Sequence, residues 1–174
     1  SLGNLDVEFM IAPWVHWPDT MFTYLKQDEV LFSTDFLGSH YAGSELFVDD
    51  FGEVKEAAKR YFAEIMMPFS SKIEGYVERI KEIDPEIIAP SHGPLYDDPD
   101  MILDKYSTWA SDEMKNKVVV PYVSMHGSTE KMVNHLIDSL IKEGVEVELF
   151  HMTESDIGDL AMSIVDAATI VVGA

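Results

Sequence analysis

The fold of the second half of the chain is decided by one stretch, VVVPYVSMHGST at residues 118–129. Residues 118–123 form a continuous apolar run, which is typical of a strand buried on both faces of a parallel sheet. A small, hydroxyl-rich turn follows at residues 124–129, and the helical spacing of apolar residues begins directly after it. The order predicts a strand, a turn and a helix, which together open a βαβ unit.

The alternation of predicted strands and helices continues to the end of the chain. Strands are predicted at residues 145–149 and 168–172, with a second helix at residues 157–165 between them. The first helix stops at Gly144 and places these apolar side chains on one face: Met132, Leu136, Ile137, Leu140 and Ile141. Right-handed crossovers join such units, so residues 118–174 predict the βαβαβ half of a doubly wound parallel sheet. We expect the sheet to continue beyond Ala174, because a chain that stops after a strand leaves an open edge.

Residues 1–113 follow a different pattern, in which short strands come first and helices follow. The polar run at residues 111–117 separates this part from the next. The opening Ser-Leu-Gly-Asn is not a natural start, which suggests a segment of a longer protein. The predicted elements are strands at 5–9, 21–25, 30–32 and 87–89, and helices at 51–65, 73–80 and 101–110.

Three histidines and one aspartate stand in loops at or near the ends of these strands: His16, Asp35, His40 and His92. Imidazole and carboxylate groups carried by several loops suit a metal site assembled from separate segments. Taken singly, each residue is more typical of a packed, hydrogen-bonded side chain than of a ligand.

The turn at residues 124–129 can present backbone N–H groups and hydroxyl groups to a phosphate at a helix N-terminus. The alternative is an ordinary strand-to-helix turn with a serine or threonine cap. The surrounding βαβαβ pattern favours phosphate binding. Because the turn lacks the glycine triplet of dinucleotide sites, it favours a mononucleotide over NAD.

Both halves resemble one family, the flavodiiron proteins. The motifs that carry the resemblance are HWPDTM at 16–21, FSTDFLGSH at 32–40, PSHGP at 90–94 and SMHGSTE at 124–130. The resemblance implies that His16 and His92 are terminal ligands on different irons and that Asp35 bridges both. It implies that His40 lies beside the site without binding iron.

The resemblance also implies the fold and the flavin site. Residues 1–113 would be the C-terminal part of a metallo-β-lactamase-like αββα domain, and residues 118–174 the first half of a flavodoxin-like FMN domain. The phosphate loop would comprise Ser124, Met125, His126, Gly127, Ser128 and Thr129, with the hydroxyl contacts from Ser124, Ser128 and Thr129. The family's first metal motif, His-x-Glu-x-Asp-His, is absent, so half of the expected ligands are missing.

The implied activity is the reduction of O₂ to water or of NO to N₂O at a non-haem diiron site, with electrons passed through FMN. The family uses reduced F420, rubredoxin or a reductase module as electron donor, and it forms head-to-tail homodimers or tetramers. Two alternatives remain open: a zinc-dependent hydrolase of the metallo-β-lactamase fold, or an FMN electron carrier with a degenerate metal domain. We expect these 174 residues alone to be inactive, because each site is incomplete.

The amino-acid composition limits the classes of partner and of cellular location that the protein can have. The formal charge is −20, from 32 acidic and 12 basic residues, which argues against binding to phosphate backbones of nucleic acids. The absence of cysteine excludes disulfides and thiolate ligands and fits a cytoplasmic protein. No apolar run is long enough to predict a membrane span.

Overall fold

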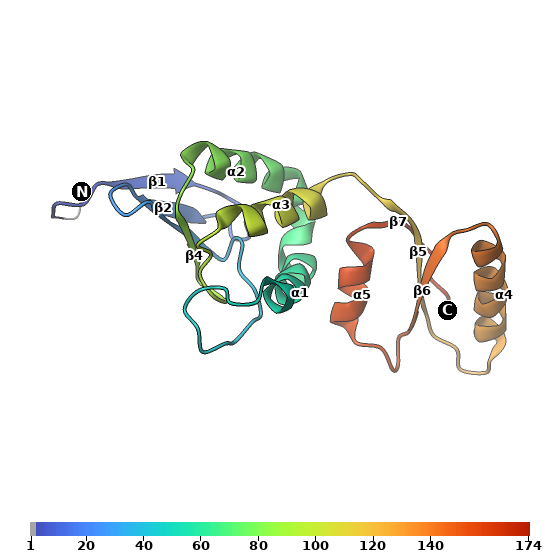
Figure 1. Ribbon diagram of the computed structural model, residues 1–174. Coiled ribbons are helices and arrows are strands. Elements are labelled where there is room, and N and C mark those ends of the chain that lie inside the picture. The colour runs from blue at the N-terminus through green and yellow to red at the C-terminus, as the bar shows by residue number, and fades with distance from the viewer. Residues whose placement is uncertain (1–2) are drawn as a thin grey trace. The chain divides into compact units, whose positions relative to one another are not determined.

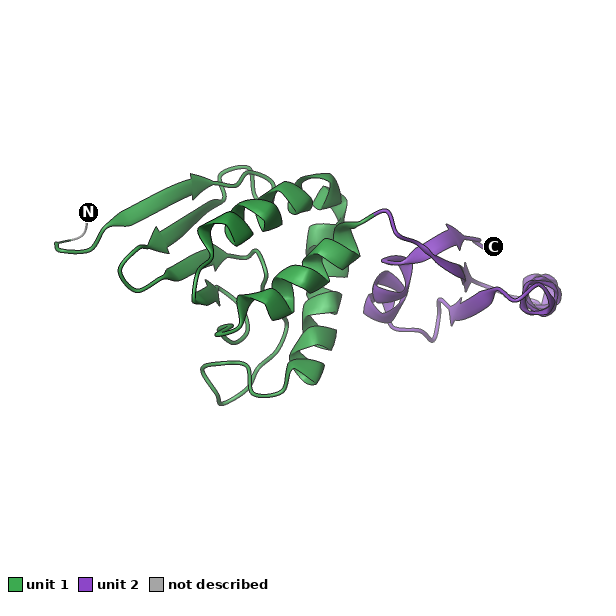
Figure 2. Cartoon of the chain, turned by 45° about the horizontal axis from the view of Figure 1, so that its top comes forward, with its two compact units in different colours: residues 1–111 green, residues 112–174 purple. Residues whose placement is uncertain are grey.

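The computed structural model describes residues 3–174. The chain divides into two compact units, Ser1–Ser111 and Asp112–Ala174 (Figure 2). Each unit has its own sheet, and the two sheets differ in strand direction. The units are therefore described separately.

The first unit contains a mixed sheet of four strands in the order β1-β2-β3-β4 (Figure 1). β1 pairs antiparallel with β2, β2 antiparallel with β3, and β3 parallel with β4. The turn at residues 26–29 forms the predicted hairpin. The strands are β1 (Val7–Ile11), β2 (Met21–Leu25), β3 (Val30–Thr34) and β4 (Ile87–Pro90).

Three helices complete this unit: α1 (Phe51–Tyr61), α2 (Ser70–Ile83) and α3 (Pro99–Ala110). α1 begins where the side chain of Asp50 accepts the N–H of Gly52. A π-helical turn (Phe62–Met66) and a 3₁₀ turn (Met67–Phe69) join α1 to α2. The second turn contains Pro68, which the sequence predicts as a helix boundary.

The helices cover one face of this sheet. On that face Met10, Phe22 and Leu31 are buried, and the ring of Phe22 lies edge-on to Tyr76 of α2 at 6.0 Å. Phe36, just after β3, packs edge-on against Tyr106 of α3 at 5.3 Å. Aromatic side chains from strand and helix therefore form the core between the two layers.

The opposite face of the sheet is apolar and exposed. The register places Phe9, Thr23 and Phe32 in one row across β1, β2 and β3, and Ile11 beside Met21 in the next. Phe9 is 59% exposed and Ile11 69%. Met10, on the other face of the same strand, faces the helices. An αββα domain buries such a face against a second sheet.

The second unit is a parallel sheet in the order β6-β5-β7 (Figure 1). Its central strand is the apolar run that opens this part of the chain, and the predicted βαβαβ order is present. Its elements are β5 (Lys115–Tyr122), α4 (Ser128–Lys142), β6 (Glu146–His151), α5 (Ile157–Ile164) and β7 (Ala167–Ile170).

The core of this unit differs in detail from the prediction. Val133 is the buried residue of α4, whereas Met132 is 74% and Ile141 59% exposed, so two of the predicted core residues lie outside. Ile137 and Leu140 do pack against the buried strand residues. A narrow row of apolar side chains on α4 faces β5. The apolar side chains at the edges of that row remain exposed to solvent.

β5 starts three residues before the apolar run, because two lysines at its start find acidic partners. The ammonium of Lys117, although its side chain is only 4% exposed, lies 2.5 Å from Asp166 and 3.2 Å from Glu148. Lys115 lies 2.6 Å from Asp166. Pairing of this kind allows a lysine to be buried at a strand end.

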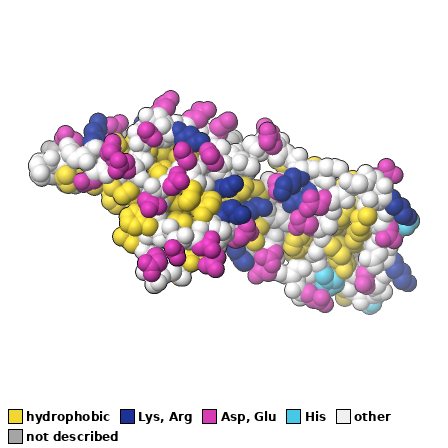
Figure 3. All heavy atoms as spheres, viewed as in Figure 1, with side chains coloured by type: hydrophobic (Ala, Val, Ile, Leu, Met, Phe, Trp, Pro, Cys, Tyr) yellow, Lys and Arg dark blue, Asp and Glu magenta, His cyan; other side chains and the backbone are white. Residues whose placement is uncertain are grey.

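On the face drawn in Figure 3, acidic side chains occur on both units. No helix within residues 3–174 is long and apolar enough to cross a membrane.

Candidate functional site

The three side chains predicted as metal ligands lie together at one end of the first sheet. Nε2 of His16 is 3.3 Å from Oδ2 of Asp35, and Nε2 of His92 is 3.2 Å from Oδ1. Asp35 thus presents one carboxylate oxygen to each imidazole. Segments more than fifty residues apart in the chain therefore meet at a single carboxylate.

A tight turn after β3 directs Asp35. The N–H of Phe36 donates to the carbonyl of Ser33 at 3.1 Å, and the N–H of Gly38 donates to the carbonyl of Asp35 at 3.2 Å. The hydroxyl of Ser33 donates to the carbonyl of Phe36 at 2.7 Å. Leu37 has a φ of 67°, a conformation that L-residues adopt only where neighbours hold them.

Backbone hydrogen bonds fasten the loop of His92 to the loop of Asp35. The N–H of Ser91 donates to the carbonyl of Thr34 at 2.6 Å, and the N–H of Ser39 donates to the carbonyl of His92 at 3.1 Å. Gly93 has a φ of 85°, and a Cβ there would collide with the hydroxyl of Ser39. Only glycine fits this position, so the glycine of the PSHGP motif holds the loop in place.

His16 is positioned by the loop between β1 and β2. The N–H of Trp14 donates to the carbonyl of Trp17 at 2.7 Å, and the N–H of Trp17 donates to the hydroxyl of Thr20 at 3.2 Å. The rings of His16 and Trp17 lie 5.3 Å apart. These contacts close the loop so that the imidazole faces Asp35.

The three donors fit part of a metal coordination sphere. With metal–ligand bonds of about 2.1 Å, neighbouring ligand atoms lie about 3.0–3.4 Å apart in octahedral or tetrahedral geometry. The two N···O distances, 3.2 and 3.3 Å, fall within this range. Across residues 3–174, however, no group of three or more His, Cys, Asp or Glu side chains could hold a metal ion by itself. A metal here would need further ligands.

The candidate centre is open to solvent. The side chain of His92 is 55% exposed, and those of His16 and Asp35 are 27% and 24% exposed. A shallow depression of about 570 Å³ lies beside them; it is lined by Trp17, Asp19, Thr20, Met21, Thr34 and Asp35. The depression leaves room for a small ligand next to Asp35.

A buried tyrosine separates His40 from these side chains. Tyr61 is 2% exposed, and its ring lies 4.9 Å from His40, edge-on, and 6.1 Å from His92. Burial, reinforced by the negative charge of Asp35, raises the pKa of Tyr61 well above its usual range. The phenol therefore stays neutral. The placement agrees with the expectation that His40 lies beside the site, and its role stays a prediction.

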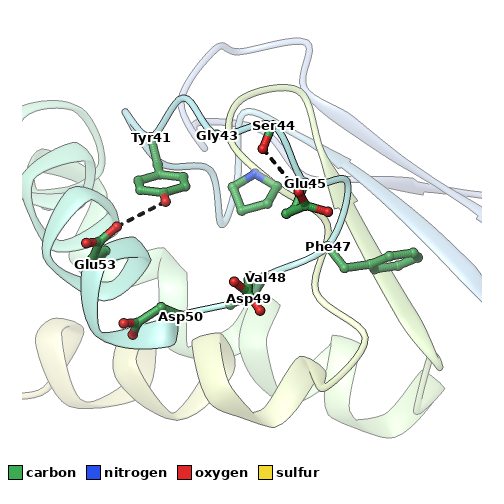
Figure 4. A pocket seen from close by; sticks show the side chains of 10 residues that line it. Tyr41, Gly43, Ser44, Glu45, Phe47, Val48, Asp49, Asp50 and Glu53 are labelled. Atoms are coloured by element: carbon green, nitrogen blue, oxygen red, sulfur yellow. Dashed lines mark hydrogen bonds between the residues drawn. The ribbon is translucent and has the colours of Figure 1, made fainter.

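Another pocket of this unit, with a volume of about 380 Å³, lies elsewhere, beyond the loop of His92. None of the candidate ligands lines it. Its wall is acidic, and the hydroxyl of Tyr41 donates to Glu53 at 3.1 Å (Figure 4). Its lining residues are Tyr41, Gly43, Ser44, Glu45, Phe47, Val48, Asp49, Asp50, Glu53 and Pro94.

In the second unit the predicted phosphate loop joins the end of β5 to α4. Gly127, with a φ of 75°, stands at the N-cap of α4 and has no side chain to cap the helix. Ser124 accepts the N–H of Glu130 at 3.3 Å through its hydroxyl. Met125 is 86% exposed. A helix N-terminus that begins at a glycine, beside hydroxyl groups, suits an anion such as a phosphate.

Gly173 packs against this loop and was not predicted as part of it. A Cβ at Gly173 would lie 2.9 Å from Cβ of Tyr122 and 3.2 Å from Cγ2 of Thr129. Its N–H donates to the carbonyl of Pro121 at 3.0 Å. The sequence carries a weak signal for it, a glycine directly after a strand, whereas Tyr61 reads as an ordinary core position of its helix.

Comparison with known proteins identifies the first part of the chain. The family model described as ODP family beta lactamase matches residues 1–93. The chain belongs to the ODP β-lactamase family. Its α/β fold class, with a metallo-β-lactamase-like part followed by a flavodoxin-like part, is thereby confirmed together with the structural matches that follow.

Relatives and solved structures extend the match over both units. The nitric oxide reductase of Moorella thermoacetica is 42% identical over 99% of the chain and 45% of its own length. Rubredoxin oxygen:oxidoreductase from Desulfovibrio gigas superposes with a TM-score of 0.92 at 32% identity, covering 99% of the chain and 45% of its own. The flavodiiron protein of Giardia intestinalis gives 0.88 at 32% identity, covering 99% and 43%.

These matches confirm the resemblance to flavodiiron proteins along nearly the whole chain. The chain spans less than half the length of the relatives that it matches. The names of the Moorella and Desulfovibrio proteins describe them as a reductase and an oxidoreductase.

Proposed function

We propose that the full-length protein is a flavodiiron oxidoreductase that reduces O₂ to water, NO to N₂O, or both. The proposal is carried by the position of Asp35 between His16 and His92, with one carboxylate oxygen toward each imidazole. A carboxylate in this position suits two cations better than one. The flavodiiron relatives point in the same direction.

In this proposal His16 would hold one iron and His92 the other, and Asp35 would be shared between them. Imidazole and carboxylate ligands with open positions suit non-haem iron. The charge of Asp35 would offset part of the repulsion between two cations. When bound, the irons supply the redox chemistry and the binding position for a diatomic substrate. The chain's own contribution is a rigid set of loops that holds the ligands before metal arrives.

We infer that the second unit binds FMN through the loop Ser124–Thr129. The hydroxyl groups of Ser124, Ser128 and Thr129 and the N-terminus of α4 would hold the phosphate. Met125, His126 and Gly127 would shape the turn around it. The acidic surface elsewhere disfavours adventitious anion binding.

The working assembly would be a head-to-tail homodimer or tetramer, in which the flavin of one subunit faces the metal centre of another. Reduced F420, rubredoxin or a reductase module would supply electrons. The lack of cysteine suits a reducing cytoplasm.

The test is the composition and turnover of the full-length protein. The proposal is supported if the protein contains both iron and FMN. It is also supported if the protein consumes O₂ or NO when an electron donor, kept reduced under anaerobic conditions, is supplied. Zinc without flavin would indicate a hydrolase instead. FMN without metal would indicate an electron carrier.

A further inference from the structure

One glycine contacts both ends of the predicted phosphate loop. Residues 124–129 leave the sheet after β5 and lead into α4. Gly173 follows β7, the strand that pairs with β5, and forms a parallel bridge with Tyr122, the last residue of β5. A residue far along the chain therefore lies where the loop begins.

Backbone hydrogen bonds fix the start of the loop. The N–H of Gly173 donates to the carbonyl of Pro121 at 3.0 Å, and the N–H of Val123 donates to the carbonyl of Gly173 at 2.9 Å. Val123 directly precedes Ser124, the first residue of the loop. Both hydrogen bonds require the backbone of Gly173 to lie close beside β5.

The missing side chain of Gly173 leaves room for the other end of the loop. A Cβ here would lie 2.9 Å from Cβ of Tyr122, 3.2 Å from Cγ2 of Thr129 and 3.2 Å from Cγ2 of Val133. The first distance is shorter than packed carbon atoms tolerate, and Cβ of Tyr122 cannot turn away because it is bonded to the backbone. An alanine would therefore push the backbone at residue 173 away from β5 and from the first turns of α4.

The same contact orients the side chain of Thr129. Its methyl carbon, Cγ2, is the atom that lies against Gly173. The methyl and hydroxyl groups of a threonine occupy different staggered positions on Cβ, so packing of the methyl group fixes the position of the hydroxyl. The close approach of Gly173 thus determines where the hydroxyl of Thr129 lies.

We propose that Gly173 is a positioning residue for the phosphate of FMN and that it sets the preference for FMN over riboflavin, the same flavin without the phosphate. The role rests on the proposed flavin site. Gly173 acts by holding Val123 at one end of the loop and Thr129 at the other. Charge-assisted hydrogen bonds depend on the positions of their donors, so a shift of either end weakens the hold on the phosphate. Riboflavin has no phosphate and is insensitive to that shift.

The test compares the affinities of the flavin-free, full-length protein for FMN and for riboflavin, measured by fluorescence titration. Gly173→Ala should lower the affinity for FMN by about tenfold or more and that for riboflavin by less than about twofold, because the hydrogen bonds to the charged phosphate are the ones disturbed. The matched control is Gly144→Ala in the same unit. Gly144 follows α4 with a φ of 75° and nothing within 4 Å, so an alanine there strains the backbone without touching the loop. The control should keep the wild-type preference.

A second variant approaches the contact from the opposite side and adds no atom. Thr129→Ser keeps the hydroxyl and removes the methyl group that lies against Gly173. The hydroxyl is then free to rotate, so the affinity for FMN should fall by about two- to fivefold, the cost of fixing one side-chain torsion, while the affinity for riboflavin stays the same. This variant decides the matter if Gly173→Ala does not fold.

Equal losses of affinity for FMN and riboflavin in Gly173→Ala would overturn the proposal, because they would show a general role in the fold of the unit. A wild-type preference for FMN in Thr129→Ser would also overturn it. If the wild-type protein binds FMN no better than riboflavin, the proposed phosphate loop itself fails, and the role of Gly173 fails with it. Failure of the role of Gly173 alone leaves the wild-type preference for FMN intact.

Discussion

The first unit assembles its candidate centre from three loops, whereas the second unit carries its candidate phosphate site in a single turn. His16, Asp35 and His92 meet because β3 and β4 pair side by side and their loops are hydrogen-bonded to each other. Residues 124–129 follow one another in a single strand-to-helix junction, against which Gly173 packs. The first site therefore depends on the whole packed unit, and the second on one strand-to-helix junction. Substitutions in the first site should therefore affect all of its ligands, whereas the effects of substitutions in the second site should stay local.

The largest effect is expected at the carboxylate shared by both histidines. In the full-length protein, Asp35→Asn should abolish O₂ or NO turnover and empty the metal site while FMN stays bound, because an amide cannot supply a bridging negative charge. Iron analysis, flavin absorbance and oxygen uptake measure the three properties. Asp97→Asn removes an exposed charge in the same unit and should change none of them. Normal iron content and oxygen uptake in Asp35→Asn would contradict the assignment of Asp35 as a metal ligand.

The contrasting change in the second unit is Thr129→Ala. Loss of one hydroxyl contact to a charged phosphate should weaken FMN binding by about ten- to hundredfold, since such hydrogen bonds contribute roughly 1.5–3 kcal/mol. Iron content should be unaffected, in keeping with a local site. Fluorescence titration of the apoprotein with FMN gives the affinity. Ser139→Ala on the outer part of α4 is the matched control, and equal loss of affinity in both variants would contradict the phosphate assignment.

Substitutions at two glycines test whether Gly93 holds the loop of His92 in place. Gly93→Ala should lower the free energy of unfolding by about 1–3 kcal/mol and loosen metal binding, because its φ is positive and the new methyl meets Ser39. Gly75→Ala, in the middle of α2 with nothing within 4 Å, should instead raise stability by about 0.5–1 kcal/mol. Urea unfolding of both variants measures the difference. A stable, iron-replete Gly93→Ala protein would show that the loop tolerates other conformations.

The smallest effect concerns pH. Burial and the charge of Asp35 raise the pKa of Tyr61 in the folded protein, so the neutral phenol is favoured there. Its contribution to stability is complete below the unfolded pKa of about 10 and falls by up to about 1.4 kcal/mol per pH unit above it, because the unfolded state then loses the proton first. Comparing denaturant unfolding of wild type and Tyr61→Phe from neutral to alkaline pH should show this slope in the wild type alone. Parallel curves would mean that the Tyr61 hydroxyl is not held neutral by the fold.

Local patterns predicted much of the fold. The run at residues 118–123 forms the central strand of a parallel sheet, as its continuous apolar character indicates. The turn at 26–29 is a hairpin, and Pro68 lies in the break between two helices. The alternation at residues 5–9 predicts a strand with two different faces, and it does not say which layer covers each face.

The sequence singled out the candidate ligands, but it did not single out the residues that surround them. His16, Asp35 and His92 stand out because their residue types recur at strand ends within motifs. Tyr61 and Glu64 do not, since one reads as a core position and the other as a solvated charge on the same helix. Tyr61 is the last residue of α1 and Glu64 lies in the π-helical turn that follows, and no local pattern in the sequence predicts that turn.

The sequence by itself determined the order of elements, the division into two kinds of α/β architecture and the residue types that can bind metal and phosphate. These depend on backbone propensity and apolar periodicity, which act over a few neighbouring residues. The tertiary structure alone decided that each oxygen of Asp35 faces a different imidazole, that Gly93 admits no side chain and that Glu64 reaches His40. Such contacts join segments far apart in the chain, and their geometry is set by packing of the whole unit, to which every layer contributes.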